Sequence, residues 1–538
     1  MITDDLCRSY LDVRWHFDPA SASAAGETRF DARLGSFDAE TVREHLAALR
    51  AIAAAAEDLE IEELEDEIDR TALLGDVRTA IAVLEDERPT VRNPEFWLTH
   101  LFQALYALLA RPGGTTAERA PAALARLEAA PAFLDQARAT VVKPPLVFVE
   151  TARTMLGGGG ELVGATVSAF AAAAPELAAQ LTAAGEETLR ALARFGTALR
   201  DEIEPDPEPR AFALGEDRFN HRLHETHALR ATAPELWRYA IHLIEEVEAD
   251  LEQVAAEIDP GADWRDVVER LRDDTPPADG VLDFYAAEVD RAREFVADRG
   301  LATVPEAPCA VVPTPAFLRP LIPFAAYEPP PVLLPERLGR FYVTEPDPAL
   351  GAEQRAALLR EHCVHEVSST VVHEAYPGHH LQLVTAQGLR SEVRRHLWTP
   401  IFVEGWALYC EALMSEEGFH AGPEARLFHL VNLLWRAVRI RLDVGLHTRE
   451  MTPAEAVDEL VSRLPMERRS AEAEVRRYCA MPTYQLSYAV GRRELLALRS
   501  DYRERAGAEF SLGAFHAAVL EYGGMPPSLV RWGLGLGV

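Results

Sequence analysis

Residues 362–384 read HCVHEVSSTVVHEAYPGHHLQLV, a stretch rich in histidine. The apolar-rich segment before His373 predicts a helix. Pro377 and Gly378 then disturb its regularity, because proline lacks a backbone N–H and glycine tolerates dihedral angles that other residues avoid. We therefore expect a distorted helix, with its irregular part between His373 and the pair His379 and His380.

Helical patterns extend from this stretch in both directions. Residues 39–139 repeat apolar positions three and four apart, and similar patterns continue to residue 297, interrupted by a proline-rich connector at 204–210. Residues 352–538 read as successive helices. Only Gly157–Gly160 stands out in the first half, and it predicts a flexible turn. The fold class is therefore mainly α.

A short β element is expected just before the histidine-rich stretch. Prolines crowd residues 304–335, which excludes a persistent helix there. Arg340–Thr344 follows, with the alternating aromatic and β-branched residues of a strand. We expect this strand to be an edge that an extended peptide could pair with. The chain then divides into an N-terminal helical region, 1–300, and a C-terminal helical region with the site, 301–538.

Composition narrows the range of partners. The chain has 538 residues, with 86 Asp and Glu against 54 Lys and Arg, giving a formal net charge of −32. Such a surface repels phosphate backbones and anionic lipid headgroups, so we expect no nucleic-acid and no membrane partner. Hydrophobic residues make up 48%, as in soluble globular proteins.

Cysteine usage and the N-terminus predict a cytoplasmic protein. The five cysteines lie far apart without a Cys-x-x-Cys pair, which argues against a disulfide framework and a thiolate zinc site. The first residues lack a basic region followed by an apolar stretch. Lys143 is the only lysine, which we attribute to a coding bias in a bacterial source.

Histidine and glutamate in this pattern point to a Zn²⁺ site. Catalytic zinc sites use three protein ligands and leave one position for water. In the motif His-Glu-x-x-His, both histidines bind the metal and the glutamate lies beside the bound water. Here Pro377 occupies the place of the second histidine, so a distorted helix must return His379 or His380 to His373. We favour His379, with His380 as the alternative.

The third ligand should come from another helix. FVEGWALYCEALMSEEG, residues 402–418, places Glu404 25 residues after His379, enough for the chain to turn and return antiparallel. Glu411 lies two turns further along the same face. We expect it to orient a ligating histidine through a hydrogen bond, without binding the metal itself. Glu374 is the predicted general base.

Other histidine clusters fit a metal site less well. HRLHETH, residues 221–227, has no partner helix bearing a glutamate at a matching distance, so we interpret it as a polar surface or groove lining. His365 lies more than two turns before His373, which favours substrate contact or support of a ligand over metal binding.

Four motifs resemble, in order, the signatures of the bacterial domain-of-unknown-function family DUF885. They are HEAYPGHHLQ (373–382), EGWALYCEALMSEEG (404–418), WRAVRIRLDVGLHTREMT (435–452) and RYCAMPTYQLSYAVGRREL (477–495). That family is similar in architecture to Taq-type metallocarboxypeptidases and thimet-type oligopeptidases. The resemblance implies a helical zinc-peptidase-like fold enclosing a deep channel, with residues 1–300 forming part of it.

The same resemblance implies a peptidase, and a carboxypeptidase in particular, with a peptide as substrate. The residues themselves indicate a zinc hydrolase. The related carboxypeptidases imply a homodimer.

A hydroxyl donor for the reaction's oxyanion is expected from the last motif. Tyr484, Tyr488 and Arg492 follow one another four residues apart and share a helix face. We assign the donor role to Tyr488, with Tyr484 in reserve, and the related oligopeptidases use a tyrosine-rich C-terminal helix for this purpose. The alternative is that both tyrosines pack in a core.

Arginines in this half give positive charge to an acidic chain. A substrate carboxylate needs such groups, and we predict Arg439, Arg492 and His447 as substrate-binding residues. The alternative for an arginine is a salt bridge to an acidic side chain.

Other function classes fit the same residues. An inactive helical scaffold would close the fourth zinc position with a further ligand, such as Cys363 or Cys410. An oligopeptidase, or a zinc hydrolase of non-peptide amides, would share the same ligand set.

Overall fold

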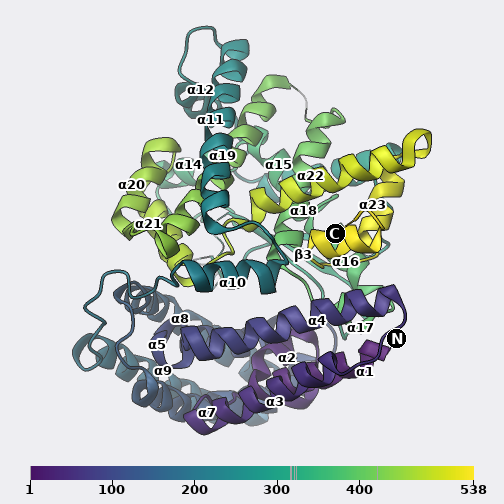
Figure 1. The fold of residues 1–538 in the computed structure, drawn as a ribbon. Helices are drawn as coiled ribbons and strands as arrows, with labels where there is room; N and C mark the ends of the chain where they lie inside the picture. The colour runs from purple at the N-terminus through teal and green to yellow at the C-terminus, as the bar shows by residue number, and fades with distance from the viewer. Residues whose placement is uncertain (1, 316–317, 320–321, 323, 421, 538) are drawn as a thin grey trace. The chain divides into compact units, whose positions relative to one another are not determined.

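The computed structural model describes residues 2–315, 318–319, 322, 324–420 and 422–537 (Figure 1). Helices hold 71% of the residues and strands 3%, so the predicted mainly α fold with a small β element is confirmed. The proline-rich segment contributes two of the strands, while its Pro320 and Pro323 lie outside the described residues.

The chain forms two compact units. The first comprises Met1–Phe212 and Pro330–Arg337, and the second Ala213–Pro329 and Leu338–Val538. Leu333 N donates to Ala25 O at 2.9 Å, which attaches the short returning segment to the first unit.

The first unit is built from helices alone. They are α1 (Ile2–Phe17), α2 (Pro19–Ala25), α3 (Ala39–Glu57), α4 (Leu64–Ala82), α5 (Pro89–Arg92), α6 (Pro94–Ala110), α7 (Thr116–Thr140), α8 (Leu146–Ala173) and α9 (Ala178–Asp201), with short turns of helix at Thr28–Phe30, Val83–Glu87 and Pro175–Leu177.

Helix α6 packs against α8 at a glycine. The flexible turn predicted for Gly157–Gly160 is wrong, because all four residues lie within α8. A Cβ on Gly159 would lie 2.2 Å from Phe102 Cζ of α6. The missing side chain therefore lets the two helices approach closely, and the cost of glycine in a helix is offset by this contact.

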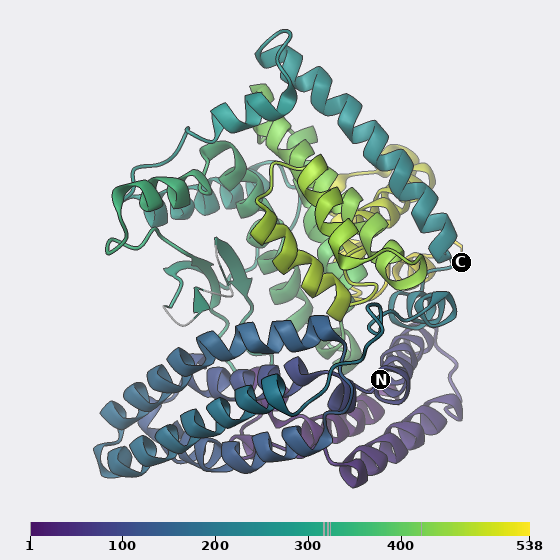
Figure 2. The same ribbon diagram turned by 90° about the vertical axis from the view of Figure 1, so that its left-hand side faces the viewer.

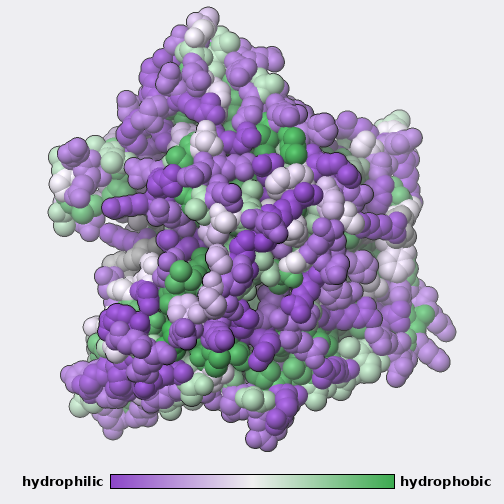
Figure 3. All heavy atoms as spheres, turned by 60° about the vertical axis from the view of Figure 1, so that its left-hand side comes forward, coloured by the Kyte–Doolittle hydropathy of each residue, from purple (hydrophilic) through white to green (hydrophobic). Residues whose placement is uncertain are grey.

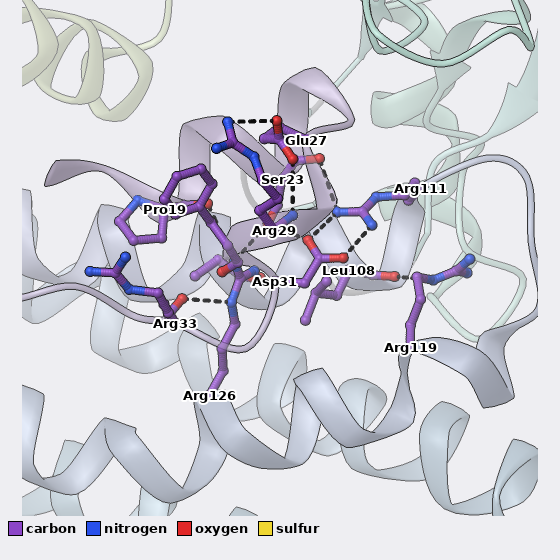
Figure 4. Close-up of polar contacts among 12 residues, drawn as sticks. Pro19, Ser23, Glu27, Arg29, Asp31, Arg33, Leu108, Arg111, Arg119 and Arg126 are labelled. Carbon is purple, nitrogen blue, oxygen red and sulfur yellow. Dashed lines mark hydrogen bonds and ion pairs between the residues drawn. The ribbon is translucent and has the colours of Figure 1, made fainter. Parts of the chain in front are cut away.

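Two arginines hold the loop after α2 in the first unit (Figure 4). Arg111 donates to both carboxylate oxygens of Asp31 at 2.6 Å. Arg126 is fully buried and donates to Arg33 O at 3.0 Å and Ser23 Oγ at 2.6 Å. Burial lowers the pKa of Arg126 to about 10, and its many acceptors compensate for the lost hydration.

The second unit holds the remaining helices and the sheet. They are α10 (Glu216–His227), α11 (Ala233–Ile258), α12 (Trp264–Leu271), α13 (Val281–Asp298), β1 (Cys309–Pro313), β2 (Ala325–Glu328), β3 (Gly339–Val343), α14 (Ala352–Arg360), α15 (Val364–Glu374), α16 (His379–Gln387), α17 (Glu392–His396), α18 (Pro400–Glu416), α19 (Gly422–Thr448), α20 (Pro453–Arg463), α21 (Arg468–Ala480), α22 (Ser487–Ala506), α23 (Leu512–Leu520) and α24 (Pro527–Gly533).

Helices α10 to α13 belong with the C-terminal half of the chain. Helix α11 packs along α19 (Figures 1 and 2). Helix α13 packs on α15. The compact units therefore divide after Phe212, whereas the sequence analysis placed its boundary at residue 300. Helical periodicity alone does not show which helices share a core.

The predicted strand is present but central. The sheet has the order β1-β3-β2, with β1 parallel and β2 antiparallel to β3. Strand β3 contains Arg340 to Val343 of the predicted segment, yet both of its edges are paired. The expectation that it offers a free edge is therefore wrong, because the proline-rich segment supplies both neighbours.

Helix α18 forms the core of the second unit. Every residue from Ile401 to Met414 is buried. The helix crosses α22 at two glycines, where a Cβ on Gly405 would lie 2.6 Å from Gly491 Cα. A Cβ on Gly491 would lie 2.0 Å from Ile401 O. This close crossing fixes the residues that flank the glycines on both helices.

One face of the molecule can be described by its hydropathy. The face drawn in Figure 3 is mostly hydrophilic, with apolar residues in scattered groups. Among the described residues, no helix combines the length and the apolar character needed to cross a bilayer.

Candidate metal centre

Three predicted ligands meet in the second unit. His373 lies in the last turn of α15, His379 begins α16, and Glu404 lies on α18. One ligand atom from each lies within 4.8 Å of the others. Glu404 Oε2 lies 3.6 Å from His373 Nε2 and 3.5 Å from His379 Nε2. All three residues are buried.

The break between α15 and α16 brings the two histidines together. Helix α15 ends at Glu374, and Gly378 N donates to Val372 O at 3.0 Å. A Cβ on Gly378 would lie 2.0 Å from His373 O, so no larger residue fits at this position. Trp406 Nε1 of α18 donates to Pro377 O at 2.9 Å. The predicted distortion is thus a complete interruption of the helix.

His380 points elsewhere. Its Nε2 donates to Ala307 O at 3.0 Å, and its Nδ1 accepts from the Tyr327 hydroxyl at 2.9 Å. Burial lowers the pKa of His380 to about 4, so the ring is neutral. Both ring nitrogens are engaged, and the geometry therefore favours His379 over His380 as the second ligand.

Glu411 supports His373 from behind, as expected. Its Oε1 accepts from His373 Nδ1 at 2.8 Å, which leaves Nε2 facing Glu404. Its Oε2 accepts from Ser369 Oγ at 3.0 Å and from His429 Nδ1 at 3.3 Å. Such a carboxylate fixes the tautomer and orientation of a ligating histidine.

Charge is concentrated in this buried group. Burial by itself would lower the pKa of His373, but its contacts with Glu404 and Glu411 raise it to about 10. Burial would raise the pKa of Glu404 and of Glu411, yet the neighbouring histidines hold both well below their usual range. Both carboxylates are therefore ionised and suited to binding or supporting a cation.

The donor set fits zinc. Zinc binds imidazole nitrogen and carboxylate oxygen at about 2.0–2.2 Å, which in tetrahedral geometry separates the ligand atoms by roughly 3.3 Å. The two nitrogen–oxygen separations of 3.5 and 3.6 Å are close to this value. In the part of the chain that the structure describes, no fourth ligand joins the group.

The two cysteines considered as closing ligands contact backbone instead. Cys410 Sγ lies 3.7 Å from Pro377 O, and Cys363 Sγ lies 3.3 Å from Leu271 O. His365, considered for substrate contact or ligand support, lies with its Nε2 2.9 Å from Asp274 Oδ2. The ligand group thus keeps one side without a protein ligand among the described residues.

The predicted acid–base residues lie near the group. Glu374 follows His373 directly, and its Oε2 accepts from Tyr327 N of β2 at 3.1 Å. The Tyr484 hydroxyl donates to Glu404 Oε1 at 2.6 Å, leaving Oε2 toward the histidines. The Tyr488 ring lies 6.3 Å from the His373 ring, nearly parallel to it.

The predicted substrate-binding residues are less directly placed. Arg439 is 3% exposed and donates to Glu474 Oε2 at 2.9 Å and the Tyr478 hydroxyl at 3.0 Å. His447 is fully buried, with its Nε2 3.0 Å from Tyr478 O, and so belongs to the core rather than to an accessible surface. Arg492 follows Gly491 on α22 and is half-buried.

Three contributors were missed by the sequence analysis. Ser369 lies four residues before His373, so helical spacing could have placed it beside the same carboxylate. His429 and the backbone of Tyr327 come from distant elements, and no local pattern identifies them.

Comparisons with known proteins agree with the motifs. The family described as "Bacterial protein of unknown function (DUF885)" matches residues 19–533. A structure described as "a putative lipoprotein of unknown function from Shewanella oneidensis" is 22% identical, with 98% of each chain covered and a TM-score of 0.80. A "putative lipoprotein from Colwellia psychrerythraea" is 17% identical, with 99% of this chain and 98% of that chain covered and a TM-score of 0.85.

At these identities the two structures show a shared fold alone. None of the curated proteins matches the chain.

Proposed function

We propose that this chain, which belongs to the bacterial family of unknown function DUF885, is a zinc-dependent metallopeptidase. The observation that carries the proposal is the group of His373, His379 and Glu404, without a fourth protein ligand among the described residues. A structural zinc site is closed by four protein ligands, whereas a catalytic site keeps one position open.

The residues around the group supply what hydrolysis needs. Bound zinc would contribute a Lewis acid that polarises a carbonyl and lowers the pKa of a water. Glu374 takes a proton from the attacking water and passes it to the leaving amine. The hydroxyl of that water joins the carbonyl carbon, the carbon–nitrogen bond breaks, and the amine leaves with the proton.

Two tyrosines have separate roles in the proposed reaction. Tyr484 orients Glu404 through its hydrogen bond to Oε1. Tyr488 donates to the oxyanion that forms when water adds to the carbonyl. Burial raises the pKa of both hydroxyls above the ordinary value, so both keep their protons at neutral pH.

The proposal includes the substrate class and the wider fold. A carboxypeptidase is the first choice, and an oligopeptidase or a hydrolase of non-peptide amides is the alternative. The deep channel expected from the family resemblance belongs to the same proposal. An inactive zinc-binding scaffold is the competing class, and the proton acceptor next to His373 argues against it because a structural site has no use for such a group.

Glu374→Gln tests the proposal directly. The variant should keep one zinc per chain, measured by mass spectrometry of the metal after dialysis. Its turnover of a mixed peptide library should fall by about 10²- to 10⁴-fold. Glu353→Gln is the control, because Glu353 is an exposed glutamate in the first turn of α14. Full activity in Glu374→Gln would remove this residue from the mechanism, and no cleavage by the zinc-loaded wild type would reject the peptidase.

The cytoplasmic location and the homodimer stay predictions. All five cysteines are free, as in a reducing compartment. The two similar structures carry the description of lipoproteins, which applies to those proteins. Fractionation of the native host and light scattering of the pure protein test the two predictions.

A further inference from the structure

Three arginines gather beside the candidate metal centre. Arg436 and Arg439 lie one turn apart on α19, and Arg477 lies on α21. Arg439 Nη2 and Arg477 Nη2 share a single carboxylate, Glu474 Oε2, at 2.9 and 2.8 Å. These three arginines and Glu474 therefore keep an excess of positive charge, in a chain whose formal net charge is −32.

Tyr488 links these arginines to the metal ligands. Its ring centre lies 6.3 Å from the ring centre of His373 and 5.9 Å from Arg436 Cζ. The two separations together place the Arg436 guanidinium within about 12 Å of the His373 ring. The charge of Arg477 acts on Tyr484 and Tyr488 as well. An extended peptide advances about 3.3–3.6 Å per residue, so one to three residues span this distance.

The three arginines differ in how far their donors are used. Arg439 is almost fully buried, and its donors are occupied by Glu474 and the Tyr478 hydroxyl. Arg436 and Arg477 are only half-buried, with 37% of the Arg477 side chain exposed.

Arg436 donates through Nη1 to Asn432 Oδ1 at 2.8 Å and Asn432 O at 3.3 Å, and Arg477 donates through Nη2 to Glu474, so each keeps other donors. The Nε of each is buried and, among the described residues, has no hydrogen-bond partner. An unsatisfied buried donor is costly, and a bound carboxylate would satisfy it.

We propose that Arg436 and Arg477 bind the C-terminal carboxylate of a peptide whose scissile carbonyl lies at His373, His379 and Glu404. This inference rests on the proposed function and specifies its substrate. The enzyme is then an exopeptidase that releases one to three residues from the C-terminus, because the distance from Arg436 to the His373 ring sets the cleavage point. An internal segment of a long peptide has no C-terminal carboxylate to place there.

One peptide prepared twice, as the free acid and as the C-terminal amide, tests the inference with the zinc-loaded full chain. KM and kcat are measured for both forms, and early products are identified by mass. The wild type should show a KM at least about tenfold lower for the free acid, since hydrogen bonds to charged groups contribute on this scale. Products should lack one to three C-terminal residues.

Variants assign the effect to the two arginines. Arg477→Gln and Arg436→Gln should each raise KM for the free acid by about 10- to 100-fold, toward the value for the amide, and change KM for the amide less than twofold. Arg477→Lys keeps the charge and should retain part of the preference. Arg468→Gln is the control, because Arg468 is an exposed arginine of α21 paired with Asp458.

The outcomes separate this inference from the proposed function. Cleavage of both peptide forms with equal KM, or internal cleavage, would overturn the inference while leaving the peptidase in place. Equal losses on both forms in Arg477→Gln and Arg436→Gln would also overturn it, by showing a general structural role. Failure of the zinc-loaded wild type to cleave either form would overturn both.

Discussion

Glu411→Gln should weaken zinc binding without unfolding the protein. Glu411 is 1% exposed and accepts hydrogen bonds from His373, Ser369 and His429 at 2.8, 3.0 and 3.3 Å. Glutamine keeps the shape but loses the charge, and only one of its two side-chain polar atoms is an acceptor. The imidazole of His373 then has a neutral amide oxygen, or no acceptor, in place of the carboxylate that fixes its tautomer.

The size of the effect follows from this contact. Loss of a carboxylate that supports a ligating histidine costs about 10- to 100-fold in metal affinity. That range corresponds to about 1.4–2.7 kcal/mol of binding free energy. The free energy of unfolding of the metal-free variant should fall less than the loss of these hydrogen bonds alone would suggest. The reason is that the variant no longer buries a charged carboxylate.

The assay is competition for zinc against a chromophoric chelator, with circular dichroism to confirm the fold. Glu416→Gln serves as the control, since Glu416 lies on the same helix but pairs with Arg499 near the surface. A folded Glu411→Gln protein with a zinc Kd within twofold of the wild type would refute the role assigned to Glu411.

Three further outcomes are expected. Tyr484→Phe removes the hydrogen bond to Glu404 and should keep zinc while lowering kcat by about tenfold or more, measured by steady-state kinetics. Gly491→Ala should destabilise the fold by about 1–3 kcal/mol or more in urea unfolding, because its Cβ would lie 2.0 Å from Ile401 O. Burial raises the pKa of Glu95 to about 7, so the folded state holds a proton that the unfolded state releases above about pH 4.5. Stability from this group is therefore present at low pH and lost as the pH rises to 7, and Glu95→Gln should flatten that decline in thermal unfolding.

Each of these has a contrary result. Unchanged kcat in Tyr484→Phe would show that the hydroxyl does not position its carboxylate. A Gly491→Ala protein as stable as the wild type would mean that the helix crossing adjusts freely. An unaltered pH profile in Glu95→Gln would show that another buried acid controls stability in this range.

The close approach of His373 and His379 was predictable because its information is local. The histidines and the intervening Pro377 and Gly378 lie within one short stretch, and their residue types restrict both the metal and the backbone path. The choice between His379 and His380 needed the structure, since the carbonyl and hydroxyl that engage His380 come from residues 307 and 327.

Contacts between distant segments explain what the sequence did not reveal. Gly157–Gly160 reads as a turn until Phe102 is seen to pack against Gly159. The segment Gly339–Val343 has the alternating pattern of a strand, which does not show whether the strand lies at the edge of a sheet. Both of its neighbours come from a segment rich in proline, where strands were not expected. Arg439 was expected to bind a substrate carboxylate, but its guanidinium is paired with Glu474. The more accessible Arg477 lies in a different helix, α21.

Locating the metal in crystals tests the proposed zinc site. Crystals of the zinc-loaded protein, measured above and below the zinc absorption edge, give an anomalous difference map that shows zinc alone. We predict one strong peak per chain, with His373 Nε2, His379 Nε2 and a Glu404 oxygen at about 2.0–2.2 Å and the fourth position taken by solvent. A map without a peak between these residues, or with zinc held by His380 or by four protein ligands, would rule out the proposed catalytic zinc site.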